Sequence, residues 1–372
     1  MKYRKLGRTD LEISEISLGT WAFGNKVYGG VDEQDGINTI HAGIDMGVNI
    51  FDAAPQYGTP LQDGVAEIVL GKALVGKRDK VHISTKFGRN PTIKNGASQF
   101  YKSRIIESVE ESLKRLQTDY IDVLFFHSPF SPDEIRDDVW EGLEQVKKQG
   151  KVRCVGHSIS MFHQTENMAR QWAQEDKIDV IQVVLSLMNR ESQQLINELQ
   201  KYPIGVFGRE CLANGFLSGA IQKDTVFAEG TLNARYSRAE IAKRVEQVDA
   251  FKFLLRNDIN NMPQAALRWV LDQKGISASV WDMHTIKPID ETAVRKAADK
   301  NKLIVTVEEH NVIGGLSSAV SECLSSYKSR PSQLSIGIND FFPKPGDYPF
   351  MLKQCGLTPE QIAQNILSSL GQ

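Results

Sequence analysis

The chain has 372 residues, of which 41% are apolar and 24% charged, enough for one domain of about 250 residues and a smaller one. Its 44 basic and 46 acidic side chains nearly cancel, which argues against disorder and against a surface specialised for nucleic acid or anionic membranes. No apolar run approaches the ~20 residues that span a bilayer, and the charged amino-terminal residues do not form a secretory leader. We therefore predict a cytoplasmic protein without nucleic-acid or membrane partners.

The four cysteines lie far apart, at Cys154, Cys211, Cys323 and Cys355. None of their spacings matches a zinc site or a redox dithiol. We predict reduced and mostly buried thiols, and no metal site.

Eight runs rich in β-branched residues alternate with stretches of helical period, which is typical of parallel strands beneath crossover helices. In chain order the runs are SEISLGTWA, VNIFDAA, KVHISTKF, YIDVLFFHS, KVRCVGHS, VIQVVLSL, IGVFGREC and ISASVWDM. Between the third and fourth, Ile105, Val109 and Leu113 share one face of a predicted helix over residues 103–116. Eight such repeats predict an α/β fold of the (β/α)8 or TIM barrel type, with the first fifteen residues as a hairpin across its amino-terminal end.

The alternation continues beyond residue 299. KLIVTVEEH and QLSIGIND predict strands, and GGLSSAVSECLSS and TPEQIAQNILSSL predict helices, the last with a threonine N-cap. A closed barrel has no free edge to accept further strands. We therefore predict a second, small α/β domain.

Polar side chains end three consecutive predicted strands, where such barrels place their functional groups. They are Asp52, Lys86 and His127, and Tyr57 follows Asp52 by five residues. A buried lysine and aspartate are costly unless paired, and pairing would hold the ammonium near Tyr57. Because a nearby cation favours phenolate, we expect the pKa of Tyr57 to fall from about 10 toward neutrality. The pattern predicts Tyr57 as a general acid and His127 as a hydrogen-bonding group that orients a substrate carbonyl.

Ordered motifs over nearly all of residues 1–275 resemble the aldo-keto reductase family: KLGRTDLEISEISLGTWAFG, FDAAPQYG, STKFG, SLKRLQTDYIDVLFFHSP, KVRCVGHS, GFLSG and AALRWVLDQKG. The resemblance implies that Asp52, Tyr57, Lys86 and His127 form a catalytic tetrad. It also implies an oxidoreductase in which NADPH gives a hydride to a carbonyl carbon while Tyr57 gives a proton to the carbonyl oxygen.

The same resemblance implies a set of cofactor contacts at the strand ends. Gly19, Thr20 and Trp21 would lie beside the nicotinamide ribose and the substrate mouth. Ser158 and Gln182 would hold the carboxamide.

After the seventh strand, the resemblance implies that Phe207 stacks on the nicotinamide face and that Arg209 and Leu212 also contact the cofactor. The chain departs from the family at two points. The usual Ser-Asn reads Ser158-Ile159, and the usual Ser-Pro-Leu reads Arg209-Glu210-Cys211-Leu212.

The last quarter of the chain resembles the C-terminal domain of transketolase-type enzymes, chiefly in DMHTIKPID and VTVEEHNVIGGL. We therefore predict a barrel over residues 1–275 and a truncated transketolase-like domain over residues 276–372. SASVWDM and DETAVRKAADKN would suit either domain, so three arrangements stay open. The barrel extends to about residue 300, or the tail takes both elements, or the tail docks on the open edge of the barrel.

The leading functional hypothesis is a reductase that converts an aldehyde or ketone to an alcohol, with a sugar as one candidate substrate. The resemblance favours NADP over NAD as the cofactor. The basic cluster that binds the 2′-phosphate in the family is missing here, and Lys287 and Arg295 are candidates to replace it. The alternative is a non-catalytic nucleotide-sensing or regulatory module built on the same barrel. A homodimer through the tail, over residues 304–335, is a further hypothesis.

Overall fold

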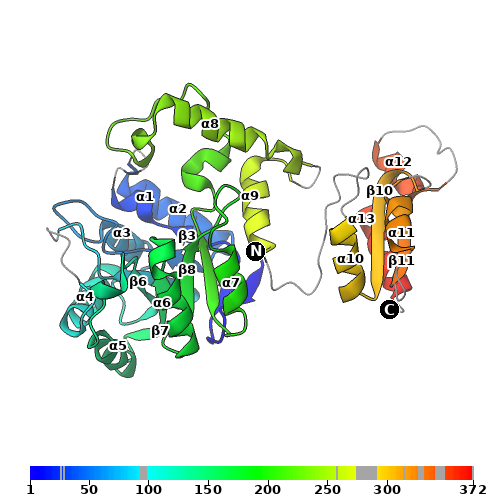
Figure 1. Ribbon diagram of the computed structural model, residues 1–372. Coiled ribbons are helices and arrows are strands. Elements are labelled where there is room, and N and C mark those ends of the chain that lie inside the picture. The colour runs from blue at the N-terminus through cyan, green and yellow to red at the C-terminus, as the bar shows by residue number, and fades with distance from the viewer. Residues whose placement is uncertain are drawn as a thin grey trace. The chain divides into compact units, whose positions relative to one another are not determined.

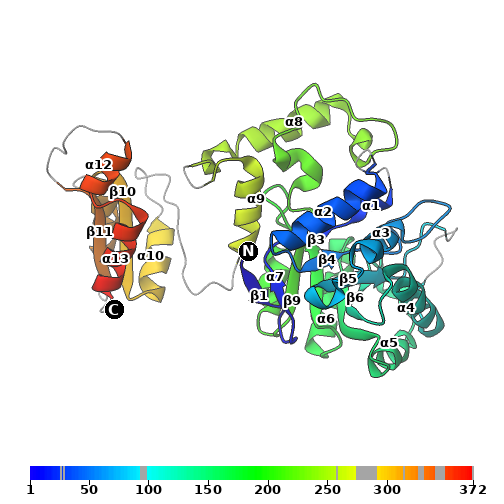
Figure 2. The same cartoon turned by 180° about the vertical axis from the view of Figure 1, so that it is seen from behind.

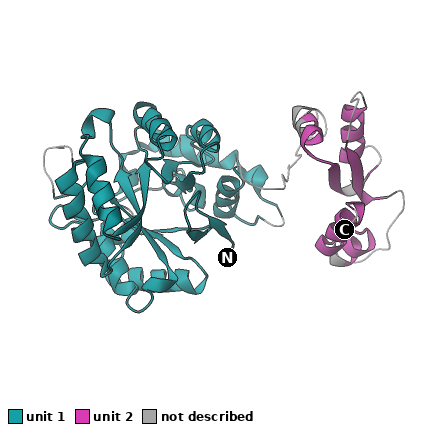
Figure 3. Ribbon diagram, turned by 90° about the horizontal axis from the view of Figure 1, so that it is seen from below, with its two compact units in different colours: residues 1–275 teal, residues 276–372 magenta. Residues whose placement is uncertain are grey.

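The computed structural model describes residues 1–25, 27, 30–92, 99–256, 259–273, 291–312, 315–325, 331–339 and 348–370. The chain divides into two compact units, Met1–Gly275 and Ile276–Gln372 (Figure 3). No helix in the described ranges is both long enough and apolar enough to cross a membrane.

The first unit is built on a curled parallel sheet whose strands pair in chain order (Figure 1). Its strands are β3 (Leu18–Gly19), β4 (Ile50–Asp52), β5 (His82–Phe87), β6 (Ile121–His127), β7 (Val152–Ser158), β8 (Val180–Val184) and β9 (Gly205–Arg209). They match the first seven predicted strands, and the expected eighth, residues 276–283, lies outside the described residues. The predicted α/β class, with barrel-type alternation of strand and helix, is confirmed.

Most helices of the first unit pack on the outer face of this sheet (Figure 2). The helices are α1 (Trp21–Gly24), α2 (Glu33–Asp45), α3 (Val65–Ala73), α4 (Lys102–Leu116), α5 (Val139–Lys148), α6 (Phe162–Gln174), α7 (Gln193–Leu199), α8 (Arg238–Asp249) and α9 (Met262–Leu271). Helix α8 instead packs in a separate apolar cluster that contains Phe216. Short 3-10 helices are η1 (Arg78–Lys80), η2 (Pro132–Glu134), η3 (Ala213–Ser218), η4 (Leu232–Arg235) and η5 (Lys252–Leu254).

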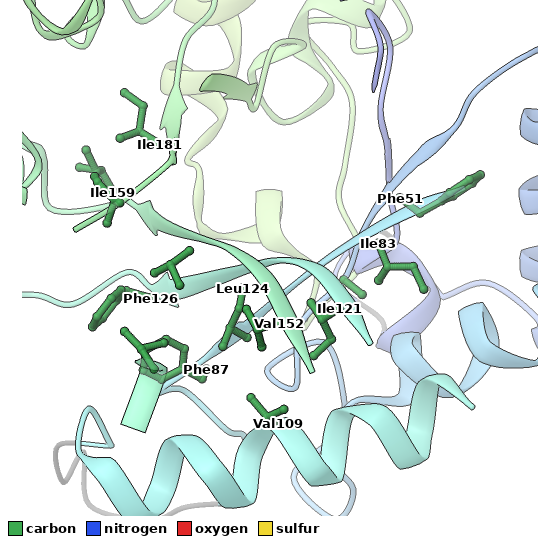
Figure 4. Packing of buried hydrophobic residues seen from close by; sticks show 14 of the residues in the cluster. Phe51, Ile83, Phe87, Val109, Ile121, Leu124, Phe126, Val152, Ile159 and Ile181 are labelled. Carbon is green, nitrogen blue, oxygen red and sulfur yellow. The ribbon is translucent and has the colours of Figure 1, made fainter. Parts of the chain in front are cut away.

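The main hydrophobic core lies between the sheet and these helices. Helix α4 shows why the sequence folds this way, since Ile105, Val109 and Leu113 recur at helical spacing and all three are buried. Figure 4 shows Val109 pointing from α4 toward the strands that carry Leu124 and Val152. The helix predicted over residues 103–116 is confirmed, and each such side chain contributes about 1.5–3 kcal/mol through burial.

A two-stranded hairpin of β1 (Tyr3–Lys5) and β2 (Glu12–Ser14) precedes the sheet. Its Leu6 and Leu11 are buried against side chains inside the curled sheet, among them Phe125. The tip lies beside the start of β9, since the backbone N–H of Arg8 donates to the carbonyl of Pro203, two residues before that strand, at 2.7 Å. The hairpin therefore closes the amino-terminal end of the sheet, as predicted, and leaves the carboxyl ends of the strands for function.

The second unit is a two-stranded parallel sheet with packed helices (Figure 3). Its elements are α10 (Glu291–Lys300), β10 (Leu303–Asn311), α11 (Leu316–Leu324), β11 (Ser332–Ile338), α12 (Tyr348–Gln354) and α13 (Pro359–Ser369). The predicted threonine N-cap is present, because Thr358 forms a capping box at the start of α13. Val294 and Ala298 of α10, the helix that both domains could claim, pack against Val320 and Leu324 within the second unit.

Candidate active site

Lys86 is the buried cation at the centre of the site. It ends β5 next to Phe87, and its side chain is 1% exposed. Its ammonium Nζ donates to Asp52 Oδ2 at 2.6 Å, to the carbonyl of Ala53 at 2.8 Å and to Tyr57 Oη at 3.2 Å. Burial opposes its charge, yet Asp52 and Tyr57 outweigh that effect and raise the pKa of Lys86. Lys86 is therefore a fixed ammonium whose three donors are all engaged.

Besides Lys86, two side chains hold Asp52 in place: Ser84 on β5 and Gln182 on β8. Its Oδ1 accepts a hydrogen bond from Ser84 Oγ at 2.7 Å and from Gln182 Nε2 at 3.2 Å, which leaves Oδ2 for Lys86. The parallel register explains this, because Asp52 pairs with Ser84 across the β4–β5 ladder. These two donors fix the carboxylate of Asp52 so that its other oxygen faces the ammonium of Lys86.

Tyr57 follows β4 and brings its hydroxyl to Lys86 Nζ. Its ring stacks on Trp21, with centroids 5.8 Å apart and planes inclined by 24°. Burial, helped by the charge of Asp52, raises the pKa of Tyr57 above 10, although Lys86 and Arg209 act to lower it. The sequence predicts a lowered pKa, and that prediction is wrong because the cost of desolvating phenolate exceeds the effect of the cation. Tyr57 therefore carries its proton throughout the neutral range.

His127 ends β6 on the other side of the phenol. Its ring meets the Tyr57 ring edge to face, with centroids 6.0 Å apart. Burial, then the charges of Lys86, Arg209 and Arg89, lower its pKa well below 6.5. The imidazole is neutral, and within the described residues its buried Nδ1 has no hydrogen-bond partner. The structure thus brings together all four side chains of the predicted tetrad.

Gly24, at the end of α1, permits the stack of Trp21 on Tyr57. A Cβ built at Gly24 would lie 2.0 Å from the carbonyl oxygen of Tyr57 and 2.4 Å from its carbonyl carbon. Such distances are far below van der Waals contact. Only glycine therefore lets α1 approach the backbone of Tyr57 this closely.

We expect Gly24→Ala to lower turnover about a hundredfold, because a shift of about 1 Å between a catalytic group and its partners costs that much. Steady-state kinetics on the folded variant measures the effect. Gly43→Ala in α2 is the matched control, since its Cβ would meet neighbours only at 3.8 Å or more. Unchanged turnover in folded Gly24→Ala would show that the close approach does not position Tyr57.

The residues expected to contact a nicotinamide cofactor partly surround this centre. Thr20 is buried and donates from Oγ1 to the carbonyl of Asp52 at 2.9 Å, while Gly19 is exposed with open space where a side chain would stand. Ser158 Oγ donates to Gln182 Oε1 at 3.1 Å. The Ser158 oxygen keeps lone pairs to accept an N–H, and the Gln182 amide has a second N–H to donate. This donor and acceptor set fits a carboxamide beside Asp52.

Strand β9 places Phe207 away from its predicted position. Its ring is 8% exposed and packs on Phe125, 5.7 Å between centroids, in the interior cluster with Leu6 and Leu11. This interior packing differs from the predicted stack of Phe207 on a nicotinamide at the mouth. Alternate residues of a strand share a face, and two residues on, Arg209 reaches the site, where its charge acts on both Tyr57 and His127.

Leu212 is half-buried and packs against the apolar cluster that contains Phe216. Of the two basic residues expected to replace the family's cluster, Lys287 lies outside the described residues. Arg295 lies on α10, in the second unit. The four cysteines are all free thiols, and burial raises the pKa of Cys154 to about 12.

Sequence reasoning missed two arginine–glutamate ion pairs in this region, Arg89 with Glu134 and Arg209 with Glu210. The two arginines could have been identified as candidate site residues from their positions at strand ends, because Arg89 follows the end of β5 by two residues and Arg209 ends β9. The partner of Arg89 lies 45 residues away, and no periodicity links the two.

Two family models match the chain: the aldo/keto reductase family over residues 15–298, and the C-terminal domain of transketolase over residues 262–362. Their overlap, residues 262–298, contains the strand and most of the helix that both domains could claim. Both predicted resemblances are thereby confirmed.

Individual relatives cover most of the chain. Aldo-keto reductase YhdN of Bacillus subtilis is 31% identical over 290 residues, 76% of this chain and 84% of its own. The NADH-specific methylglyoxal reductase of Escherichia coli is 30% identical over 295 residues, 74% of this chain and 87% of its own. Among solved structures, the glycerol dehydrogenase AKR11B4 from Gluconobacter oxydans aligns with a TM-score of 0.61 at 25% identity, over 92% of this chain and 98% of its own.

Proposed function

We propose that this chain, which belongs to the aldo/keto reductase family, reduces the carbonyl group of an aldehyde or ketone to an alcohol. As a member of the family it is an oxidoreductase. The observation that carries the proposal is the convergence of Asp52, Tyr57, Lys86 and His127 at the carboxyl ends of the strands. The reacting carbonyl would lie between the Tyr57 hydroxyl and the His127 ring.

Tyr57 is proposed as the general acid. Its hydroxyl keeps its proton at neutral pH because burial raises its pKa, so the proton leaves only for an oxygen that has become strongly basic. Lys86 Nζ, 3.2 Å away, stabilises the phenolate that remains. Asp52 keeps Lys86 charged and in position. The Tyr57 proton therefore ends on the substrate oxygen as the alcohol forms.

The neutral imidazole of His127 is proposed to orient the carbonyl by a hydrogen bond. Ser158 and Gln182 would hold the cofactor's carboxamide, and Gly19 leaves open space beside Thr20 for its ribose. A bound nicotinamide dinucleotide supplies the hydride for the carbonyl carbon. NADPH is the proposed reductant, with NADH as the alternative that the name of the E. coli relative supports.

Nucleotide binding and turnover together test this function. Titration with NADPH and with NADH, followed by fluorescence, should show binding of at least one, and a small aldehyde should then accelerate its oxidation. Binding of neither nucleotide would end the reductase proposal. Binding without aldehyde-dependent oxidation would instead support the nucleotide-sensing module.

We also propose that the second unit is a separate domain that pairs two copies of the chain. Its parallel sheet of β10 and β11 offers open edges within the described residues, and open edges invite pairing with another chain. Light scattering of the full-length protein at micromolar concentration should give the mass of a dimer. A strictly monomeric mass would contradict this proposal and leave the reductase function untouched.

A further inference from the structure

Two arginine–glutamate pairs flank the catalytic centre on the loops that follow the strands. Arg89 Nη2 donates to Glu134 Oε2 at 2.5 Å, and Arg209 Nη1 donates to Glu210 Oε1 at 2.5 Å. All four side chains are mostly buried, with exposed fractions between 17% and 29%. At this degree of burial, solvent screens the charges only in part.

The two pairs are joined to each other beside His127. Arg89 Nη2 also donates to the carbonyl of Ser128, and Arg209 Nη2 donates to Ser160 Oγ at 2.7 Å. Ser160 Oγ in turn donates to Ser128 Oγ at 2.8 Å. The chain of contacts from Arg89 to Arg209 therefore passes through Ser128 and Ser160, which lie one residue after β6 and two residues after β7.

The backbone shows that these loops carry strain. Ser128 and Glu210 have φ angles of 52° and 55°, in the left-handed region where glycine is favoured. Glu210 stays there while its carboxylate accepts from Arg209 and also from Asn214 Nδ2 at 3.2 Å. Backbone strain of this kind is typical of functional sites, and here it places a carboxylate against a guanidinium at the mouth.

The pairs carry no net charge, but they are oriented. The guanidinium of each pair is the end that bonds Ser128 or Ser160, and Ser128 directly follows His127. The cationic ends therefore lie on the side of the pairs next to the reacting centre, where both charges act on the imidazole of His127. An oriented dipole stabilises the partial negative charge that develops on a carbonyl oxygen. It supplies no full counter-charge to offset the desolvation of a phosphate or carboxylate group.

We propose that Glu134 and Glu210 are specificity-determining residues that make the mouth select uncharged carbonyl substrates, such as hydroxyaldehydes, over phosphorylated or carboxylated ones. This inference rests on the proposed reductase function and names its substrate class. Glu134 is the better position to test, because Arg89 keeps two other anchors when the carboxylate is removed. Its guanidinium still bonds the carbonyl of Ser128 and lies 4.0 Å from the centroid of the Phe130 ring.

The experiment compares glyceraldehyde with glyceraldehyde 3-phosphate by their kcat/KM values. The wild-type protein should favour glyceraldehyde by at least about tenfold. Glu134→Gln keeps an oxygen to accept from Arg89 but leaves the guanidinium uncompensated, so the preference should move about tenfold toward the phosphate. Glu141→Gln is the matched control, because it removes the same charge from an exposed pair with Lys102. The ratio of the two kcat/KM values in Glu141→Gln should equal the ratio in the wild-type protein.

Calorimetric titration with phosphoglycolate, an unreactive anion, gives a second readout that does not need turnover. Glu134→Gln should bind it at least about tenfold more tightly than the wild type or Glu141→Gln. Equal binding by all three proteins, or a wild-type preference for glyceraldehyde 3-phosphate, overturns the inference. If the wild type turns over neither aldehyde, the reductase proposal fails, and calorimetry still decides whether Glu134 excludes anions.

Discussion

Replacing Tyr57 with phenylalanine is expected to lower turnover about a thousandfold while nucleotide affinity stays within about twofold of the wild-type value. A positioned general acid contributes about 10²–10⁴-fold, and phenylalanine removes the only proton that the ring can give. The ring itself remains, so its stack on Trp21 is kept. Steady-state kinetics with a small aldehyde and fluorescence titration of the nucleotide separate the two effects.

The pH profile adds a second readout for Tyr57. An acid must be protonated to act, and burial raises the pKa of Tyr57 above 10. The wild-type rate of reduction should therefore stay level from pH 6 to 9 and fall only at higher pH. Tyr120→Phe is the control, because it removes the hydroxyl of a tyrosine stacked on Arg78 at the start of β6. Undiminished turnover in Tyr57→Phe would refute the assignment of this residue as the acid.

Much of the fold could be predicted because local signals and the fold agree. Buried parallel strands give continuous apolar runs, and each of the seven described strands lies in one of them. The position of functional groups at strand ends follows from the same topology, which is why Asp52, Lys86 and His127 could be grouped from sequence. The parallel register then brings them to one mouth.

Other features depend on quantities that the sequence does not contain. The pKa of Tyr57 is set by a balance between desolvation and charge, and only packing determines how buried the phenol is. Phe207 was expected at the mouth, yet it lies one layer deeper than Arg209 on the same face of β9. Strand alternation predicts which face of the sheet a side chain lies on. How far the side chain lies from the mouth of the barrel depends on the register between neighbouring strands, which the sequence does not state.

The contested helix shows a similar limit. The apolar face of α10 would suit either a barrel or a tail, because a hydrophobic stripe does not specify its partner. In the structure, Val294 and Ala298 pack within the second unit, while both family models extend into this helix. The contested strand lies outside the described residues.

The amino-terminal end of the sheet depends on Asp122, and Asp122→Asn should lower the free energy of unfolding of the first unit by about 3 kcal/mol. The carboxylate is fully buried and bonds Arg78 at 2.7 Å, Arg153 at 2.6 Å and the backbone N–H of Ile83 at 2.9 Å. Asparagine keeps the shape but removes the charge from two guanidinium groups, and breaking a buried pair costs about 3–5 kcal/mol. We expect a cost at the low end of this range, because Arg153 is 35% exposed and solvent screens its charge in part.

The same network predicts how stability depends on pH. Hydrogen bonds from His82 and the charge of Arg78 outweigh burial and lower the pKa of Asp122 from 3.8 to about 2. A depressed pKa means that the unfolded chain binds the proton first as pH falls. The contribution of about 2 kcal/mol is therefore complete above pH 4 and disappears as pH falls toward 2. The stability difference between wild type and Asp122→Asn should shrink over that interval.

Urea unfolding followed by tryptophan fluorescence measures this in the full-length chain, because four of its five tryptophans lie in the first unit. Asp10→Asn is a matched control, since Asp10 bonds the same Arg153 at 2.9 Å but is 79% exposed. An exposed pair is worth at most about 1 kcal/mol. Equal losses from the two substitutions would show that burial does not set the strength of this network. A larger loss from Asp122→Asn follows if the closed end of the sheet depends on an ionised carboxylate in its interior.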